Sequence, residues 1–233
     1  MLCRPKLNPV AVGLVALVTH PVFAQRDRNE GPPVEAADVR QAIQRGVGYL
    51  LREQSARGHW DDIAAYPGGV TSLCTLALLN SGQTPDEPHI RRALDYLRRI
   101  KPQKTYTVSL QTMALAAAEP AKDMLTIQNH VNWLEQHQIR EGNRAGAWSY
   151  DDPKGAGGGD NSNAQFAVLA LYEAQRAGAK VDPKTWELAL DYWTRTQNEN
   201  GSWGYGPGDA GYGSMTCAGI GGLIADRLAI REG

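Results

Sequence analysis

The stretch Gln197-Asn198-Glu199-Asn200-Gly201-Ser202-Trp203 decides the fold, because related stretches occur twice more along the chain. Gln54-Ser55-Ala56-Arg57-Gly58-His59-Trp60 has the same spacing, and a looser version runs from Gln138 to Gly146-Ala147-Trp148. Glycine permits a positive φ at a helix end, and tryptophan supplies an apolar anchor whose N–H needs a partner. The sequence therefore predicts three turns, built by Gln54, Gly58, Trp60, Gly146, Trp148, Gln197, Gly201 and Trp203.

Two classes of helix alternate around these turns. The first class is amphipathic, with apolar residues at i, i+3 and i+4, and is expected near 36–54, 86–100, 122–138 and 183–197. Its centres carry an aromatic followed by a bulky residue: Tyr49-Leu50, Tyr96-Leu97, Trp133-Leu134 and Tyr192-Trp193. The second class is apolar nearly all round, is expected to be buried, and begins at Ser72, Ser109, Asn163 and Ser214.

The order of amphipathic helix, turn and buried helix occurs four times, which indicates a helical-hairpin repeat. The buried helices should form an inner wall and the amphipathic helices an outer wall. The second hairpin lacks the turn motif and has Lys101-Pro102-Gln103-Lys104-Thr105 in its place.

The first 24 of the 233 residues have the pattern of a secretory signal. Arg4 and Lys6 form a basic start, 10–18 an apolar core, and Val22-Phe23-Ala24 a small-residue cleavage site. We expect an exported protein, periplasmic or secreted, with a flexible leader over 25–35 and a repeat domain over 36–230. A retained N-terminal anchor is the alternative, and no later apolar run approaches membrane length.

Charge and cysteine content limit the choice of partners. The chain has a formal net charge of −1 and no basic cluster, so we expect no nucleic-acid partner. Two cysteines, Cys74 and Cys217, follow the signal segment. A disulfide between them and two buried free thiols are both compatible with their apolar surroundings.

This pattern resembles the prenyltransferase and squalene-cyclase repeat family, whose fold is an α/α toroid. The turns described above carry the resemblance, together with the Ser/Asn-x-Gln-x-x-Ala/Val-Leu starts at Ser109 and Asn163. The resemblance covers roughly 36–230 and implies an all-α chain. A closed toroid of this family has more hairpins than the four counted here. We therefore expect an incomplete α/α toroid.

The resemblance raises the possibility of a terpenoid cyclase, which protonates a polyene with an Asp-x-Asp-Asp motif. Tyr150-Asp151-Asp152-Pro153 holds only half of that motif, and Asp160 follows nearby. Asp151, Asp152 and Asp160 are the candidate catalytic acids. Alternatively, Asp160 caps a helix and Asp151-Asp152 form a polar turn. Phe166 is the one aromatic residue expected on a buried helix, which disfavours polycyclisation.

Other chemistries have weaker support. Cys217 has no His or Asp at the spacing of a prenyltransferase zinc site, and His130 and His137 are expected on a solvated face. We expect neither a metal nor a cofactor, although the Asp/Gly-rich loop before Asn161 leaves calcium open. A toroid polysaccharide lyase or glycosidase would use Tyr150, Tyr205, Tyr212 and Asp209, which follow in similar loops.

The remaining candidate is a binding surface at the end of the bore where the buried helices begin. Its residues are Ser109, Gln111, Asn163, Gln165, Ser214, Thr216 and Tyr150. They favour a small apolar or hydroxylated ligand, unless the Ser and Asn residues only cap helices and the Gln residues only join hairpins. The leading expectation is an exported, non-catalytic repeat domain that binds a ligand or partner at the bore or open edge. Exposed terminal repeats also predict self-association or a partner domain that completes the ring.

Overall fold

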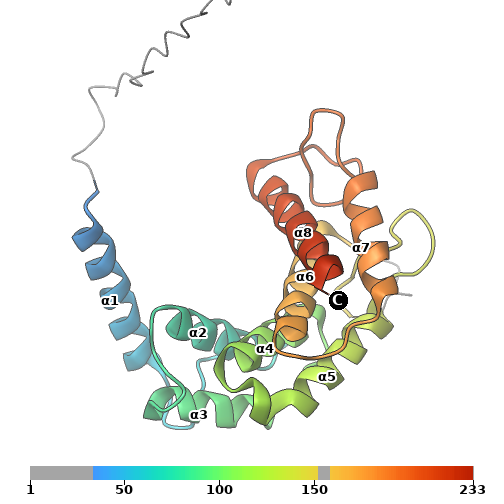
Figure 1. The fold of residues 1–233 in the computed structure, drawn as a ribbon. Helices are drawn as coiled ribbons and strands as arrows, with labels where there is room; N and C mark the ends of the chain where they lie inside the picture. Colours follow the sequence, from blue (N-terminus) through green and yellow to red (C-terminus); the bar gives the residue numbers. More distant parts are fainter. Residues whose placement is uncertain (1–33, 152–157, 233) are drawn as a thin grey trace, which may run out of the picture.

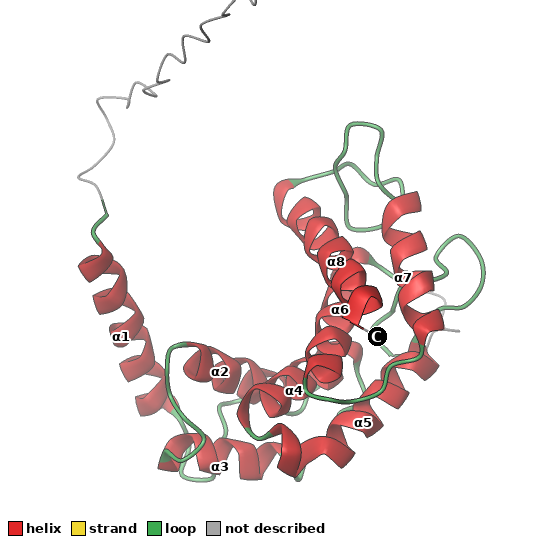
Figure 2. Ribbon diagram, viewed as in Figure 1, coloured by secondary structure: helices red, strands yellow, loops and turns green. Residues whose placement is uncertain are grey.

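The computed structural model describes residues 34–151 and 158–232, and the secondary structure of this part is helical (Figure 2). The helices are α1 (Ala36–Glu53), α2 (Gly69–Asn80), α3 (Pro88–Leu97), α4 (Thr105–Ala118), α5 (Pro120–His137), α6 (Asn161–Arg176), α7 (Pro183–Arg195) and α8 (Gly213–Glu232). The expected signal segment 1–24, most of the leader and Asp152 lie outside the described residues.

The helices follow one another along an open arc, with α1 at one end and the α7–α8 pair at the other (Figure 1). The even-numbered helices pack in succession, α2 on α4, α4 on α6 and α6 on α8. The helices α3, α5 and α7 pack on the outside of this inner row. The prediction of an all-α toroid-type fold built from four hairpins is confirmed.

The inner helices begin earlier than the sequence predicted. Their first residues are Gly69, Thr105, Asn161 and Gly213. The difference is largest for α4, where Ser109 lies in the helix interior and is buried. Lys104 occupies the N-cap of α4 without a side-chain cap bond, so no sequence signal marked this start. The correction places Tyr106 on an inner helix.

Each tryptophan of the turns bonds to a carbonyl of the preceding outer helix. The indole Nε1 of Trp60 donates to the Leu50 oxygen at 2.9 Å, and that of Trp148 donates to the Leu134 oxygen at 2.7 Å. Trp203 donates to the Trp193 oxygen at 3.0 Å. The acceptor is always the second member of the aromatic–bulky pair, so the anchor is the same in all three hairpins.

Gln111 takes the place of this tryptophan in the second hairpin. Its Nε2 donates to the Leu97 oxygen at 2.6 Å, and Leu97 is the second member of the pair Tyr96-Leu97. The side chain is buried, so the bond is shielded from water. Gln111 therefore supports the fold, whereas the sequence placed it in a ligand site.

Replacing Gln111 by methionine is expected to lower the free energy of unfolding by about 0.5–1.5 kcal/mol, because the Leu97 oxygen loses one of its two hydrogen bonds and keeps the one from the Ile100 N–H. The same change at Gln165, a half-buried residue of α6, is the control and should cost less. Urea denaturation of both variants measures the difference. Equal costs would show that the Gln111 bond contributes nothing specific.

Two buried side chains in the last hairpin have polar groups without a hydrogen-bond partner within the described residues. Asp226 on α8 is fully buried, and neither of its carboxylate oxygens has a hydrogen-bond partner within the described residues. Burial raises the pKa of this carboxyl to about 8. The indole N–H of Trp193, which packs against Gly222 one turn earlier, is also unpartnered there.

No helix in the described part of the chain is long and apolar enough to cross a membrane.

Candidate functional site

The candidate site lies at the mouth of the bore, which we define as the face of the arc at which the inner helices begin. Loops from later hairpins bond to the first turns of earlier inner helices. The backbone N–H of Thr105 donates to the Tyr150 oxygen at 2.8 Å, and that of Asn161 donates to the Tyr205 oxygen at 2.9 Å. These bonds hold two loop tyrosines against the starts of α4 and α6.

Four aromatic rings form a continuous row across this mouth. The Tyr150 ring lies 6.5 Å from that of Tyr66 and 5.7 Å from that of Tyr106, between ring centroids. Tyr106 in turn lies 4.8 Å from Phe166 of α6. The expectation that Phe166 is the one aromatic residue on an inner helix is wrong, because α4 begins at Thr105 and carries Tyr106.

Hydroxyl groups extend the row. The hydroxyl oxygens of Tyr150 and Tyr205 are 2.8 Å apart, and that of Tyr106 is 2.6 Å from Oγ of Ser162. Desolvation, followed by the hydrogen bond to Tyr150, raises the pKa of Tyr205, and burial also raises the pKa of Tyr106. The phenols of Tyr106 and Tyr205 are therefore neutral at physiological pH and can both donate and accept hydrogen bonds.

An apolar cavity of about 270 Å³ opens on one side of this row. It is lined by Ile63, Tyr66, Gly69, Val70, Leu73, Tyr106, Thr107, Leu110 and Tyr150. Ile63 and Leu73 are more than half exposed, so the cavity presents apolar surface to solvent. Exposed apolar surface of this kind is typical of a binding site.

A second, more polar cavity of about 270 Å³ lies on the other side of Tyr150. Its lining residues are Arg144, Ser149, Tyr150, Gly158, Asp160, Tyr205, Gly206 and Asp209. Arg144 donates to the Gly159 oxygen, and Asp209 accepts the Gly206 N–H at 2.7 Å. Tyr150 therefore separates an apolar compartment from one that offers a guanidinium, two carboxylates and two phenols.

The two candidate acids that the structure describes, Asp151 and Asp160, have different partners. Asp160 is buried at the N-cap of α6, where its Oδ1 accepts the Asn163 N–H and its Oδ2 accepts the Asn163 amide, both at 2.8 Å. Burial raises the pKa of the Asp160 carboxyl, although the bonds from Asn163 act in the opposite direction. Asp151 is exposed and pairs with Lys104. Asp152 lies outside the described residues.

Of the seven residues placed in the ligand site, Tyr150 alone lines either mouth cavity. Thr216 accepts the Trp203 N–H at 3.3 Å and donates to the Tyr212 oxygen, so it supports a turn. Ser109 and Asn163 are buried within helices, Gln165 is half-buried, and Ser214 is exposed. Tyr66 and Tyr106 escaped the sequence analysis because each precedes the predicted start of its inner helix.

The residues weighed for metal and thiol chemistry lie apart. His130 is buried, its Nδ1 lies 3.0 Å from Oγ1 of Thr112, and burial lowers its pKa to about 4, so the expectation of a solvated face is wrong for it. Cys74 and Cys217 are free thiols, the first half-buried and the second exposed. No group of three or more His, Cys, Asp or Glu suited to a metal gathers within 34–151 and 158–232.

Comparison with known protein families gives a match. Residues 69–213, more than half of the chain, match the family model described as squalene-hopene cyclase C-terminal domain. The match runs from the first residue of α2 to the first residue of α8 and contains both mouth cavities except Ile63 and Tyr66. No curated protein matches the chain.

Proposed function

The chain belongs to the squalene-hopene cyclase C-terminal domain family, and on this premise we propose that it binds an amphipathic ligand at the mouth of its open arc. The apolar part of the ligand occupies the cavity beside Leu73, and its hydroxylated end reaches the polar cavity beside Tyr205. Binding without chemical conversion is the proposed activity.

The position of Tyr150 carries this proposal. Tyr150 lines both cavities, so a single molecule that passes over it contacts an apolar wall and a hydrogen-bonding wall. Pockets that bind small molecules combine a mainly apolar lining with a few placed polar groups, and the two compartments supply both. The hydroxyl groups of Tyr150 and Tyr205 suit a ligand hydroxyl group, which also donates and accepts.

Farnesol and squalene are suitable probes, because both are isoprenoid chains and farnesol alone carries a hydroxyl. Titration followed by intrinsic fluorescence should show that farnesol binds more tightly. Leu73→Asp should weaken farnesol binding about tenfold or more, because it places a charge in the apolar cavity. Ile224→Asp on α8 is the matched control, since Ile224 is similarly exposed and lies outside both cavities.

Tyr205→Phe tests the polar cavity separately from the apolar cavity. Loss of one hydroxyl should weaken farnesol binding about three- to tenfold and leave squalene binding unchanged. The proposal fails if Leu73→Asp and Ile224→Asp have equal effects, or if Tyr205→Phe weakens both probes to the same extent.

A cyclase that uses Asp160 as its general acid is the second candidate. Burial raises the pKa of this carboxyl, and Asp160 lines the polar cavity beside Tyr150 and Tyr205. Against it, each carboxylate oxygen already accepts a hydrogen bond from Asn163, which favours the ionised form. Incubation with squalene and product analysis distinguishes the two: cyclic products that disappear in Asp160→Asn would establish the cyclase.

A further inference from the structure

Each internal turn also holds the outer helix of a neighbouring hairpin. Gln54 Nε2 donates to its own Gly58 oxygen at 3.0 Å and to the His89 oxygen of α3 at 2.9 Å. Gln138 Nε2 donates likewise to the Gly146 oxygen at 3.3 Å and to the Thr185 oxygen of α7 at 3.0 Å. Both glutamines thus use one N–H within the turn and one between hairpins.

The glycines of these turns lie directly against the same helices. A Cβ added to Gly58 would meet the Arg92 oxygen of α3 at 2.4 Å, and one added to Gly146 would meet the Leu188 oxygen of α7 at 2.0 Å. Only a residue without a side chain allows this approach, because real Cβ contacts are longer.

The two contacts share one register. His89 and Thr185 precede Tyr96 and Tyr192, the tyrosines near the C-terminal ends of α3 and α7, by the same seven residues. Arg92 and Leu188 precede the same tyrosines by four residues. The Tyr96 ring also stacks on His59 of the preceding turn, with centroids 4.8 Å apart. The position of a residue relative to this tyrosine therefore indicates which part of a turn the residue contacts.

The last turn has the same residues and lacks this neighbour. Gln197 Nε2 donates to the Gly201 oxygen at 2.9 Å, and within the described residues it has no second acceptor. A Cβ on Gly201 would meet nothing nearer than the Gln197 amide at 4.0 Å. Gln197 and Gly201 are exposed, whereas Gly58 and Gly146 are buried. The turn at 197–203 is therefore a docking position without an outer helix.

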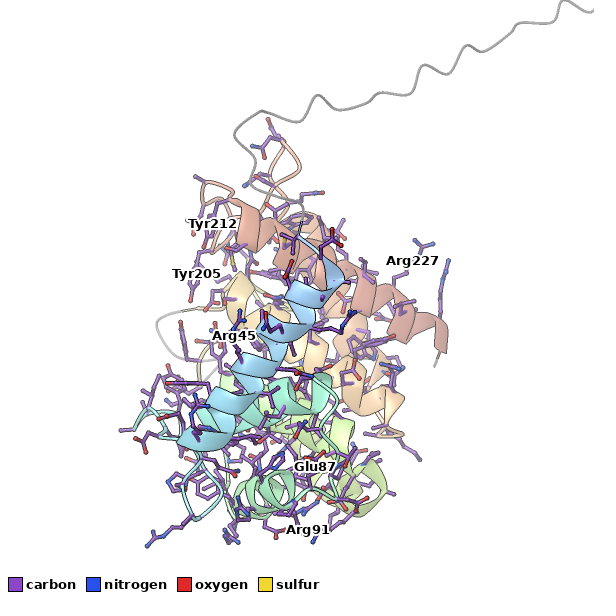
Figure 3. The ribbon with its side chains drawn as sticks, turned by 90° about the vertical axis from the view of Figure 1, so that its left-hand side faces the viewer. Arg45, Glu87, Arg91, Tyr205, Tyr212 and Arg227 are labelled. Carbon is purple, nitrogen blue, oxygen red and sulfur yellow. The ribbon has the colours of Figure 1, made fainter. Side chains whose placement is uncertain are left out.

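The helix α1 lies at the other end of the arc (Figure 1). It has the residues by which α3 and α7 contact a preceding turn. It contains no buried residue, and Tyr49, which corresponds to Tyr96 and Tyr192, is 55% exposed. Arg45 lies at the register position of Arg92, whose Nη2 donates to Oε1 of Gln54 at 3.1 Å. Figure 3, which looks onto this end of the arc, shows α1 across the front with Arg45 labelled on it.

Arg52 is a second residue of α1 that matches an arginine of another outer helix. It occupies the register position of Arg195, whose guanidinium donates to the Asn143 oxygen at 2.7 Å and to the Ala145 oxygen at 2.9 Å in the preceding turn. The helix α1 thus has two arginines at positions where Arg92 of α3 and Arg195 of α7 contact a preceding turn. Among the described residues, no turn precedes α1.

We propose that α1 of a second copy of this chain docks on the turn at 197–203, in the register that α3 and α7 use within the chain. In this arrangement the Gln197 amide donates to the Ala42 carbonyl, Arg45 donates to Oε1 of Gln197, and Tyr49 packs on Ser202. The association is head-to-tail, so each copy contributes one edge.

Site-directed cross-linking tests the orientation. The native cysteines are first replaced, Cys3 and the exposed Cys217 by serine and the half-buried Cys74 by alanine, and Tyr49→Cys and Ser202→Cys are then made in separate chains. A short bis-maleimide should join the two variants when they are mixed and should join neither variant to itself. Cross-linking of Tyr49→Cys chains to one another would overturn the proposal, because such a product requires a symmetric contact between two α1 helices.

Sedimentation velocity over a range of concentrations tests the affinity. The full chain should form dimers or larger assemblies, and Arg45→Glu should raise the dissociation constant about tenfold or more, because it removes a donor to Gln197. Arg40→Glu makes the same charge change on another face of α1 and should leave the dissociation constant unchanged. A chain that stays monomeric, or equal effects of the two substitutions, would contradict the proposal.

Discussion

Replacing Gly146 by alanine is expected to lower the free energy of unfolding by about 3–5 kcal/mol, whereas the same change at Gly201 should cost about 1–2 kcal/mol. Both glycines have a positive φ, 94° and 83°, so both substitutions strain the backbone. Only the new Cβ at position 146 also meets a backbone oxygen, that of Leu188 at 2.0 Å. The helix α7 would have to move away from the turn.

Gly58→Ala provides an independent repetition of the first result. Its φ is 90°, and the added Cβ would meet the Arg92 oxygen at 2.4 Å, so its cost should resemble that of Gly146→Ala. Urea denaturation of the three variants at low protein concentration, where copies do not associate, gives the comparison. If Gly201→Ala cost as much as the other two, the close approach of helix and turn would not contribute to stability.

Raising the pH from about 4 to about 8 is expected to destabilise the folded chain through Asp226. Burial raises the folded-state pKa of this carboxyl to about 8, above its value in the unfolded chain. Between these two values the folded state binds the proton more tightly, so stability falls as pH rises. The loss is on the order of several kcal/mol, at about 1.4 kcal/mol per pKa unit.

Asp226→Asn should remove this contribution and should stabilise the chain most at the upper end of the range. The comparison of variant and parent is needed because His130 acts in the opposite sense: burial lowers its pKa to about 4, so it destabilises the fold as pH falls. Asp191→Asn, an exposed site on α7, is the control. A parent and an Asp226→Asn variant with parallel stability profiles would show that Asp226 is accommodated without cost.

The sequence was sufficient to predict the architecture because the residues that mark its turns act locally. The Gln, Gly and Trp residues of a turn act within a few residues of a helix end, and the aromatic–bulky pair marks the acceptor for the indole. A pattern of this kind repeats wherever the local structure repeats. Gln111 is the exception: its role in the second hairpin follows only when its bond to the Leu97 oxygen is seen.

The candidate site could not be derived in the same way because it is assembled from different hairpins. Tyr66 precedes α2, Tyr106 lies on α4, and Tyr150 lies before α6, and only the packing of the arc brings their rings together. The unmarked start of α4 at Thr105 hid Tyr106 from the sequence analysis. The lack of a hydrogen-bond partner for Asp226 was equally hidden, since it depends on which side chains pack against α8.

Hydrogen exchange of the full chain, measured with and without farnesol, tests the proposed ligand site most directly. The account predicts that farnesol slows exchange in the peptides that contain Leu73, Tyr106, Tyr150 and Tyr205, which together line the two mouth cavities. A third cavity at the opposite end of the last hairpin, beside Trp186 and Ala229, provides the internal comparison. Protection confined to that end, with none at the mouth, would contradict the account.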